Sequence, residues 1–271
     1  MKSESDLQNS ATSTISLYWK ITTILFLLLL ICLFFWRSTG KIHFVFFGLC
    51  LLLFHQGVYI YGMLSSRTNL FIKTIKGRDL FRENPGYLLR FDDGPHPDYT
   101  PQILELLKKY KQKAIFFLTG HQAEKYPQLV RQIIRENHRI GNHTYSHPYN
   151  FVFLSKKTIR LEIEKTNRII KNITGMTPVY FGPPMGHKVP RLASVLKQLN
   201  LTAMMWDINS KDTVLTKNNI LKRIQKQSIR NKIILFHDGI YPWTKQTRND
   251  TLLALKQFLV NSKDMNFKVR R

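Results

Sequence analysis

Two apolar runs near the N-terminus constrain the fold of this chain more than any other feature of its sequence. The first covers Ile21–Trp36 and the second covers Ile42–Leu64, with the short polar segment RSTGK between them. A helix needs about 20 apolar residues to cross a bilayer. The second run meets that length, and the first meets it if residues 17–19 extend it and Lys20 reaches back to the headgroups.

Because these runs have almost no polar face, we predict two membrane-spanning helices within residues 17–64, after a polar tail at residues 1–16. A helical hairpin buried in a soluble core is the alternative, and the lack of a polar face disfavours it. A cleavable signal peptide would have a shorter apolar stretch and a small-residue cleavage site, and the sequence shows neither. Two spans place both chain ends on one side of the membrane.

The sequence does not decide on which side of the membrane the two chain ends lie. Lys and Arg are more frequent outside the turn than in it, which favours a cytoplasmic location for both ends. Large domains can nevertheless be translocated regardless of charge. The net charge is +24, and the excess falls mostly after residue 65. No helix-turn-helix, RRM or zinc-finger spacing accompanies it, so we expect attraction to anionic headgroups rather than to nucleic acid.

From Gly86 onward, short apolar runs alternate with amphipathic stretches. The run YLLRF precedes a loop and the helical pattern PQILELLKKY, and the runs KAIFFLTG, PVYFG, TAMMWDI and KIILFHDG follow later. Such alternation predicts an α/β domain with parallel strands joined by crossover helices. We assign residues 86–271 to this domain and residues 65–85 to a basic linker. Both cysteines, Cys32 and Cys50, lie before the linker, so the domain has no thiol chemistry.

Polar clusters at the ends of these apolar runs indicate a catalytic site. In a parallel barrel such loops meet on one face. His143 and His147 could ligate one metal ion with a carboxylate, although such a pair alone is often found on a surface turn. Asp92 and Asp93 supply candidate carboxylates, and neighbouring side chains at a strand end point in different directions. One could ligate the metal while the other acts as a base, and His237 could supply a proton. The non-catalytic alternatives are that the two aspartates cap a turn and that His237 has a structural role.

These motifs, in this order, resemble the NodB-homology polysaccharide deacetylases, carbohydrate esterase family four. The segments that carry the resemblance are FDDGPHPDYTPQILELLKKY, KAIFFLTG, RIGNHTYSHP, FGPPMG, WDINSKD and LFHDG, of which RIGNHTYSHP is the most specific. The resemblance covers the chain from about Tyr87 to its C-terminus. It implies a distorted (β/α) barrel, here preceded by the two-helix transmembrane hairpin, and a metal-dependent N- or O-deacetylase activity.

The resemblance also implies roles for individual residues. Asp92 matches the catalytic base and His237 the catalytic acid. Asp93, His143 and His147 match the ligands of a divalent metal, with zinc the expected ion.

Two further residues are implied as supporting groups. The backbone N–H of Met185 corresponds to an oxyanion donor. Asp212 corresponds to the carboxylate that supports His237, with Asp207 as the alternative.

The chain departs from the family pattern before the paired prolines. Gly182 stands where the family usually has an arginine that contacts the base. Lys188 and Arg191 are close enough in sequence to supply a cation instead. Thr213 stands in place of a frequent tryptophan, and Met185 in place of a frequent aromatic residue.

The sequence therefore predicts a membrane-anchored, metal-dependent hydrolase. Its expected substrate is an N-acetylated amino sugar in a glycan or a lipid-linked saccharide, and its expected location is a bacterial inner or plasma membrane. The alternative, motivated by Gly182, is a degenerate deacetylase-like module that binds glycan without cleaving it. The intact set of predicted metal ligands argues against that alternative.

Overall fold

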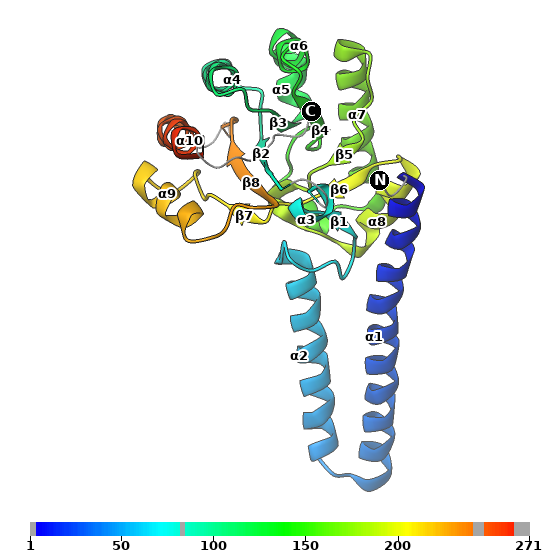
Figure 1. The fold of residues 1–271 in the computed structure, drawn as a ribbon. Coiled ribbons are helices and arrows are strands. Elements are labelled where there is room, and N and C mark those ends of the chain that lie inside the picture. Colours follow the sequence, from blue (N-terminus) through cyan, green and yellow to red (C-terminus); the bar gives the residue numbers. More distant parts are fainter. Residues whose placement is uncertain (1–3, 82–84, 241–246, 263–271) are drawn as a thin grey trace.

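The computed structural model describes residues 4–81, 85–240 and 247–262. Two long helices project from an α/β domain (Figure 1). The helices of the described residues are α1 (Glu4–Thr39), α2 (His43–Leu64), α3 (Gly77–Leu80), α4 (Tyr99–Lys109), α5 (Gly120–Lys125), α6 (Pro127–Arg135), α7 (Lys156–Thr174), α8 (Pro190–Gln198), α9 (Lys217–Gln225) and α10 (Asn249–Ser262). Two short 3₁₀ helices are η1 (Phe151–Phe153) and η2 (Pro184–Gly186).

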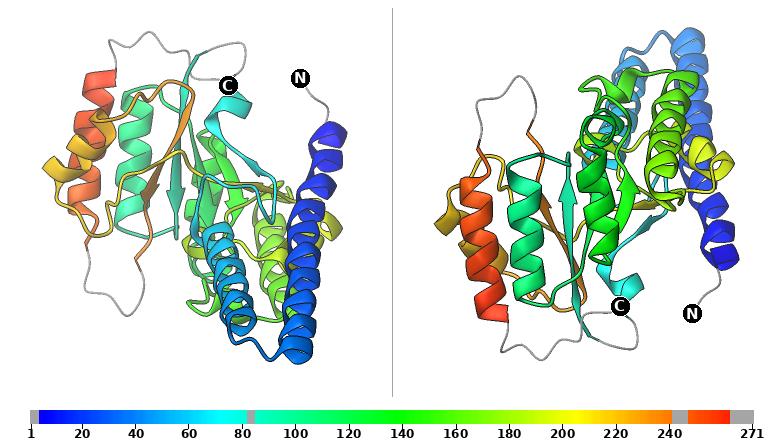
Figure 2. Two further views of the ribbon diagram at one scale, coloured as in Figure 1. Left: turned by 90° about the horizontal axis from the view of Figure 1, so that it is seen from below. Right: turned by 90° about the horizontal axis from the view of Figure 1, so that it is seen from above.

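The described strands form one parallel sheet, in the order β1-β6-β5-β4-β3-β2-β8-β7. Their bounds are β1 (Thr74–Ile75), β2 (Tyr87–Asp92), β3 (Ala114–Leu118), β4 (Arg139–Asn142), β5 (Tyr180–Phe181), β6 (Thr202–Met204), β7 (Ile208–Asn209) and β8 (Lys232–His237). The sheet curls into a half-barrel, with helices α4 to α7, α9 and α10 around its outer side (Figures 1 and 2). The predicted distorted (β/α) barrel is confirmed.

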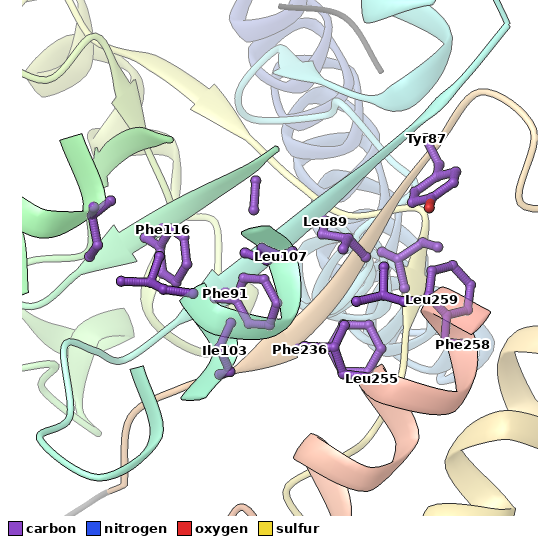
Figure 3. Close-up of a cluster of buried hydrophobic side chains, with 14 of the residues drawn as sticks. Tyr87, Leu89, Phe91, Ile103, Leu107, Phe116, Phe236, Leu255, Phe258 and Leu259 are labelled. Carbon is purple, nitrogen blue, oxygen red and sulfur yellow. The ribbon is translucent and has the colours of Figure 1, made fainter. Parts of the chain in front are cut away.

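Strand β2 separates the hydrophobic core from the interior of the barrel. Successive side chains of a strand point to opposite faces. Tyr87, Leu89 and Phe91 are buried in the cluster that packs against the outer helices, and Figure 3 shows them facing side chains of α4 and α10. The ring of Phe91 stacks on Phe116 with a centroid distance of 5.0 Å. Arg90, two residues before the end of the strand, points to the opposite face and into the barrel.

Helices α1 and α2 are long and apolar enough to cross a membrane, over Tyr18–Thr39 and His43–Leu64. Only 6% of each of these windows is buried. The alternative of a hairpin buried in a soluble core is therefore wrong for this structure. The polar segment predicted as a tail is helical from Glu4 onward, and this part of α1 lies beside α8 (Figure 1).

The segment 65–85, predicted as a basic linker, carries two elements of the domain. Strand β1 pairs in parallel with β6, with Thr74 opposite Ala203, and α3 follows it. Phe71 and Ile72 are buried among residues of α7 and α8 and the α1 residue Tyr18. The segment is thus packed against the domain over most of its described length.

A buried lysine joins the end of α2 to this domain. The ammonium group of Lys188 donates to the carbonyls of Ser65 (2.7 Å) and Thr68, and its backbone N–H donates to the carbonyl of Met63 at 3.0 Å. Burial lowers the pKa of Lys188 to about 8. These carbonyls belong to the C-terminal end of α2 and the turn after it, where a helix leaves acceptors without partners and carries partial negative charge.

We predict that a chain starting at Arg67 is clearly more stable than one starting at Gly86. The shorter chain loses Phe71, Ile72 and Ile75, and burying each such side chain contributes about 1.5–3 kcal/mol. Urea unfolding of the two soluble fragments, followed by near-ultraviolet circular dichroism, would measure the difference. Equal midpoints would show that β1 and the segment before it contribute nothing to the domain.

Candidate metal and catalytic site

The site lies where four neighbouring strands end. Strands β2 and β8 pair in register, so that Asp92 lies opposite His237. On the other side of β2, strand β4 ends at Asn142, directly before His143. Because the strands are parallel, their carboxyl ends meet at one edge of the barrel. The predicted polar clusters are therefore brought together by strand pairing.

Three of the predicted residues form a compact group that could hold a metal ion. Ligand atoms of Asp93, His143 and His147 lie within 4.8 Å of one another, and all three side chains are buried. The Asp93 Oδ1 atom is 3.3 Å from His143 Nε2 and 3.6 Å from His147 Nε2. Two imidazoles and one carboxylate with converging ligand atoms make a donor set typical of an open zinc site.

The hydrogen bonding of these side chains fits a bound cation. Both carboxylate oxygens of Asp93 are buried and accept no hydrogen bond from any described residue. Burial alone would raise the pKa of Asp93, but the His143 and His147 rings lower it well below its usual range. The Nδ1 atom of His143 lies 2.7 Å from the carbonyl of Gly182. A donor at Nδ1 leaves the Nε2 lone pair directed at the site.

Burial also keeps the second imidazole neutral. It lowers the pKa of His147 to about 4, with the His143 ring acting in the same direction and Asp93 against it. A neutral imidazole is the form that ligates a metal.

The loop between the two histidines is held by a carboxylate of α7. Glu162 accepts hydrogen bonds from the backbone N–H groups of Tyr145 (3.0 Å) and Ser146 (2.8 Å). Thr144 and His147 have positive φ values of 65° and 48°. Residues with side chains adopt this conformation only where the surroundings stabilise it. Glu162 therefore helps to fix the backbone that presents both rings.

The half-buried His237 and the buried Asp212 form a second pair at the same edge. Asp212 Oδ1 lies 2.8 Å from His237 Nδ1, and Oδ2 accepts from the backbone N–H of His237 at 2.9 Å. The hydroxyls of Ser210 and Thr251 also donate to this carboxylate, each at 2.9 Å. Burial would lower the pKa of His237, but Asp212, with Asp93 and Asp92, raises it to about 9.

The structure places the alternative carboxylate, Asp207, elsewhere. Its Oδ2 accepts from the backbone N–H groups of Gly77 and Ile233, which links α3 to the start of β8. Met185 lies in η2 with a φ of 54°, and the residue is 43% exposed. Its backbone is thus held in a left-handed conformation directly after the paired prolines.

Arg90 contacts the proposed base and is not among the residues that the sequence predicts for this site. Its Nε donates to Asp92 Oδ1 and its Nη2 to Asp92 Oδ2, each at 2.7 Å. The expected substitutes for the family arginine do not contact Asp92. Lys188 binds the carbonyls after α2, and Arg191 donates to the carbonyls of Leu154 and Val152. The signal that could have identified Arg90 is its spacing, because residues two apart in a strand share a face.

Comparison with known proteins points to one family. Residues 82–205 match the family model described as polysaccharide deacetylase. A peptidoglycan-N-acetylglucosamine deacetylase of Bacillus cereus is 36% identical over 150 residues, which cover 55% of this chain and 54% of that protein. A chitooligosaccharide deacetylase of Azorhizobium caulinodans is 31% identical over 176 residues, which cover 62% of this chain and 83% of that protein. The chain thus spans only about half the length of the Bacillus cereus relative.

Solved structures agree with these relatives. The peptidoglycan deacetylase PdaC of Bacillus subtilis superposes with a TM-score of 0.61 at 32% identity, over 69% of this chain and 87% of that one. A pseudoenzyme of carbohydrate esterase family 4 from Bacillus anthracis gives the same TM-score at 27% identity, over 69% of this chain and 63% of that one. The same fold therefore occurs in an enzyme and in a pseudoenzyme.

We predict that His143→Ala or His147→Ala removes bound metal, because each deletes one of three clustered protein ligands. Metal content after loading with zinc, and the rise in melting temperature that zinc causes, would both fall. His121→Ala is the matched control, since this histidine is exposed and outside the group. Full occupancy in either triad variant would contradict the assignment of the ligands.

Proposed function

This chain belongs to the polysaccharide deacetylase family, and on that premise we propose that it is a metal-dependent carbohydrate deacetylase. It would hydrolyse the acetamido group of an N-acetylated amino sugar in a glycan or a lipid-linked saccharide. The observation that carries the proposal is the convergence of the Asp93–His143–His147 group with Asp92 and His237 at one edge of the barrel. These residues supply metal ligands, a base and an acid within one site.

The chemistry follows from the position of each group. A divalent metal held by the triad, with zinc the expected ion, would lower the pKa of a water molecule and polarise the acetyl carbonyl. Asp92 Oδ2 lies 3.7 Å from His143 Nε2. This carboxylate is therefore close enough to the Asp93–His143–His147 group to take a proton from the attacking water. The oxygen of that water bonds to the acetyl carbon, and the backbone N–H of Met185 stabilises the resulting oxyanion.

Cleavage of the C–N bond then needs a proton for the leaving amine. The hydrogen bond of His237 Nδ1 to Asp212 directs its other ring nitrogen into the site, and Asp212 favours the protonated ring. His237 would therefore donate the proton, and the products are acetate and a free amino sugar.

The substrate class and the location are proposed by likeness. The named relatives deacetylate peptidoglycan or chitooligosaccharides, and the two apolar helices of this chain could hold the site beside a membrane. We propose two spans in a bacterial inner or plasma membrane and a glycan or lipid-linked sugar near its surface. The basic charge favours an anionic surface or substrate over an uncharged one.

A non-catalytic glycan-binding module is the second candidate, and the pseudoenzyme relative gives it support. In the sequence alone, the absence of an arginine at position 182 favours this candidate. In this structure Arg90 already donates two hydrogen bonds to Asp92. An intact base, acid and ligand group favour the enzyme, because a binding protein has no need of all three.

The direct test is acetate release by the full chain in detergent, with added zinc. We expect release from N-acetylglucosamine oligomers or from peptidoglycan fragments, and its loss in Asp92→Asn. Asp207→Asn is the matched control, because among the described residues this carboxylate accepts hydrogen bonds from the backbone N–H groups of Gly77 and Ile233, away from the site. Glycan binding without acetate release, in a protein with full metal content, would favour the second candidate.

The role of the acid generates a prediction about pH. The raised pKa of His237 keeps its protonated, proton-donating form present until the pH rises through that value. Asp212→Asn removes the largest favourable interaction of the protonated ring, so its pKa falls. The basic limb of the kcat profile should therefore move to lower pH. An unmoved basic limb in an active Asp212→Asn enzyme would assign that limb to another group.

A further inference from the structure

We infer that Arg90 is the positioning residue that orients the Asp92 carboxylate, and that Gly182 is the residue whose small size makes room for it. The inference rests on the proposed function, since it assigns a partner to the proposed base. The guanidinium group meets the carboxylate side on, with Nε to Oδ1 and Nη2 to Oδ2 both at 2.7 Å. A bidentate pair of this kind fixes the plane of the carboxylate as well as its place.

The guanidinium group is itself held in place by other strands. Arg90 is fully buried, and its Nη1 donates to the carbonyl of Met204 on β6. Its central carbon lies 4.0 Å from the ring centre of Phe117 and 5.3 Å from that of Trp206. An arginine packed between aromatic rings has few other conformations available. The orientation that it gives to Asp92 is therefore set by the barrel.

The orientation matters because of what lies beyond the carboxylate. Asp92 Oδ2, which accepts from Nη2, is also the oxygen 3.7 Å from His143 Nε2. Arg90 thus holds the carboxylate so that this one oxygen faces the Asp93–His143–His147 group. A displacement of about 1 Å in a reacting group can lower a rate by about 100-fold.

Gly182 lies directly against this guanidinium group. A Cβ atom at position 182 would be 2.5 Å from Arg90 Nη2 and 2.8 Å from the Phe117 ring. Real Cβ contacts are longer than this, so any side chain there must displace Arg90 or Phe117. The carbonyl of Gly182 also lies 2.7 Å from His143 Nδ1. Gly182 is therefore matched to an arginine that comes from β2.

This pairing reverses the expected effect of one substitution. Gly182→Arg restores the residue that the family usually carries, and by sequence alone it looks like a repair. In this chain two arginines would compete for one space, and the carboxylate already has its partner. The geometry points to a loss of activity in Gly182→Arg and in the milder Gly182→Ala.

The test compares kcat and KM for acetate release by full-length variants loaded with zinc. We expect Arg90→Lys to lower kcat about 10- to 100-fold, with KM and metal content near those of the unmodified chain, because lysine keeps the charge but loses the bidentate geometry. Arg191→Lys is the matched control, since this arginine donates to the backbone carbonyls of Leu154 and Val152, away from Asp92. Its kcat should stay within about three-fold of that of the unmodified chain.

Chemical rescue separates positioning from a merely structural role. Guanidinium chloride at concentrations that do not unfold the protein should restore part of the kcat of Arg90→Ala. Urea, which has a similar planar shape but no charge, should restore none. If the Arg90 variants do not fold, Gly182→Ala serves as the second variant. It retains Arg90 but moves its guanidinium group, so the kcat of Gly182→Ala should still fall.

Each result decides the matter. An unchanged kcat in Arg90→Lys, or in Gly182→Ala with full metal content, overturns the inference while the proposed function stands, since the unmodified chain still releases acetate. An unmodified chain that is loaded with metal but releases no acetate from any substrate overturns the proposed function and this inference together. Lowered kcat in both variants, with rescue by guanidinium and not by urea, supports it.

Discussion

The site depends on the pairing of β2 with both of its neighbours. The register with β8 sets Asp92 opposite His237, and the register with β3 continues the sheet toward β4 and its histidine loop. The alternation of β2 then divides its residues between two tasks. Leu89 and Phe91 stabilise the packing against the outer helices, while Arg90 and Asp92 face the other way. A shift of one residue in this register would move the Asp92 side chain, the proposed base, into the core.

Bringing these groups together buries three carboxylates, and each of them has a different set of partners. Asp92 is paired with Arg90, and Asp212 with His237 and two hydroxyls. Asp93 has two imidazoles nearby but no hydrogen-bond donor among the described residues. A buried carboxylate without a donor is costly unless a cation accompanies it. Of these three carboxylates, Asp93 is the one without a donor among the described residues, and the ligand pattern assigns it to the metal.

Much of this arrangement follows from local sequence, and what does not follow depends on contacts between distant strands. The runs of β2, β3 and β8 are apolar and long, so they predict strands. Strand β4 reads RIGN and β1 has two residues, and neither carries an apolar pattern. Helix α7 is not among the elements predicted from the sequence, although Ile159, Ile163 and Ile170 recur at helical spacing.

The site shows the same division. The ligand, base and acid candidates follow apolar runs in the sequence, so position along the chain is enough to find them. Sequence proximity to Gly182 favours Lys188 and Arg191 as partners of Asp92. The barrel instead supplies the partner from within β2, through the space that Gly182 leaves. A motif read along the chain does not show that the space beside Gly182, which follows β5, is filled by a side chain of β2.

The connection between the two apolar helices and the site is also a matter of packing. Lys188 lies three residues after Met185, and it is hydrogen bonded to the carbonyls that follow α2. The turn that carries the proposed oxyanion donor is therefore fastened to the end of α2 without a flexible segment between them. A Cβ atom on Gly62 would be 2.7 Å from Leu70 and 2.8 Å from Phe71, so the chain folds back closely on the helix. If α1 and α2 lie in a bilayer, this junction fixes the distance and direction of the site relative to the membrane surface. The site would then stay at one height above the membrane, whereas a site on a flexible linker would sample many.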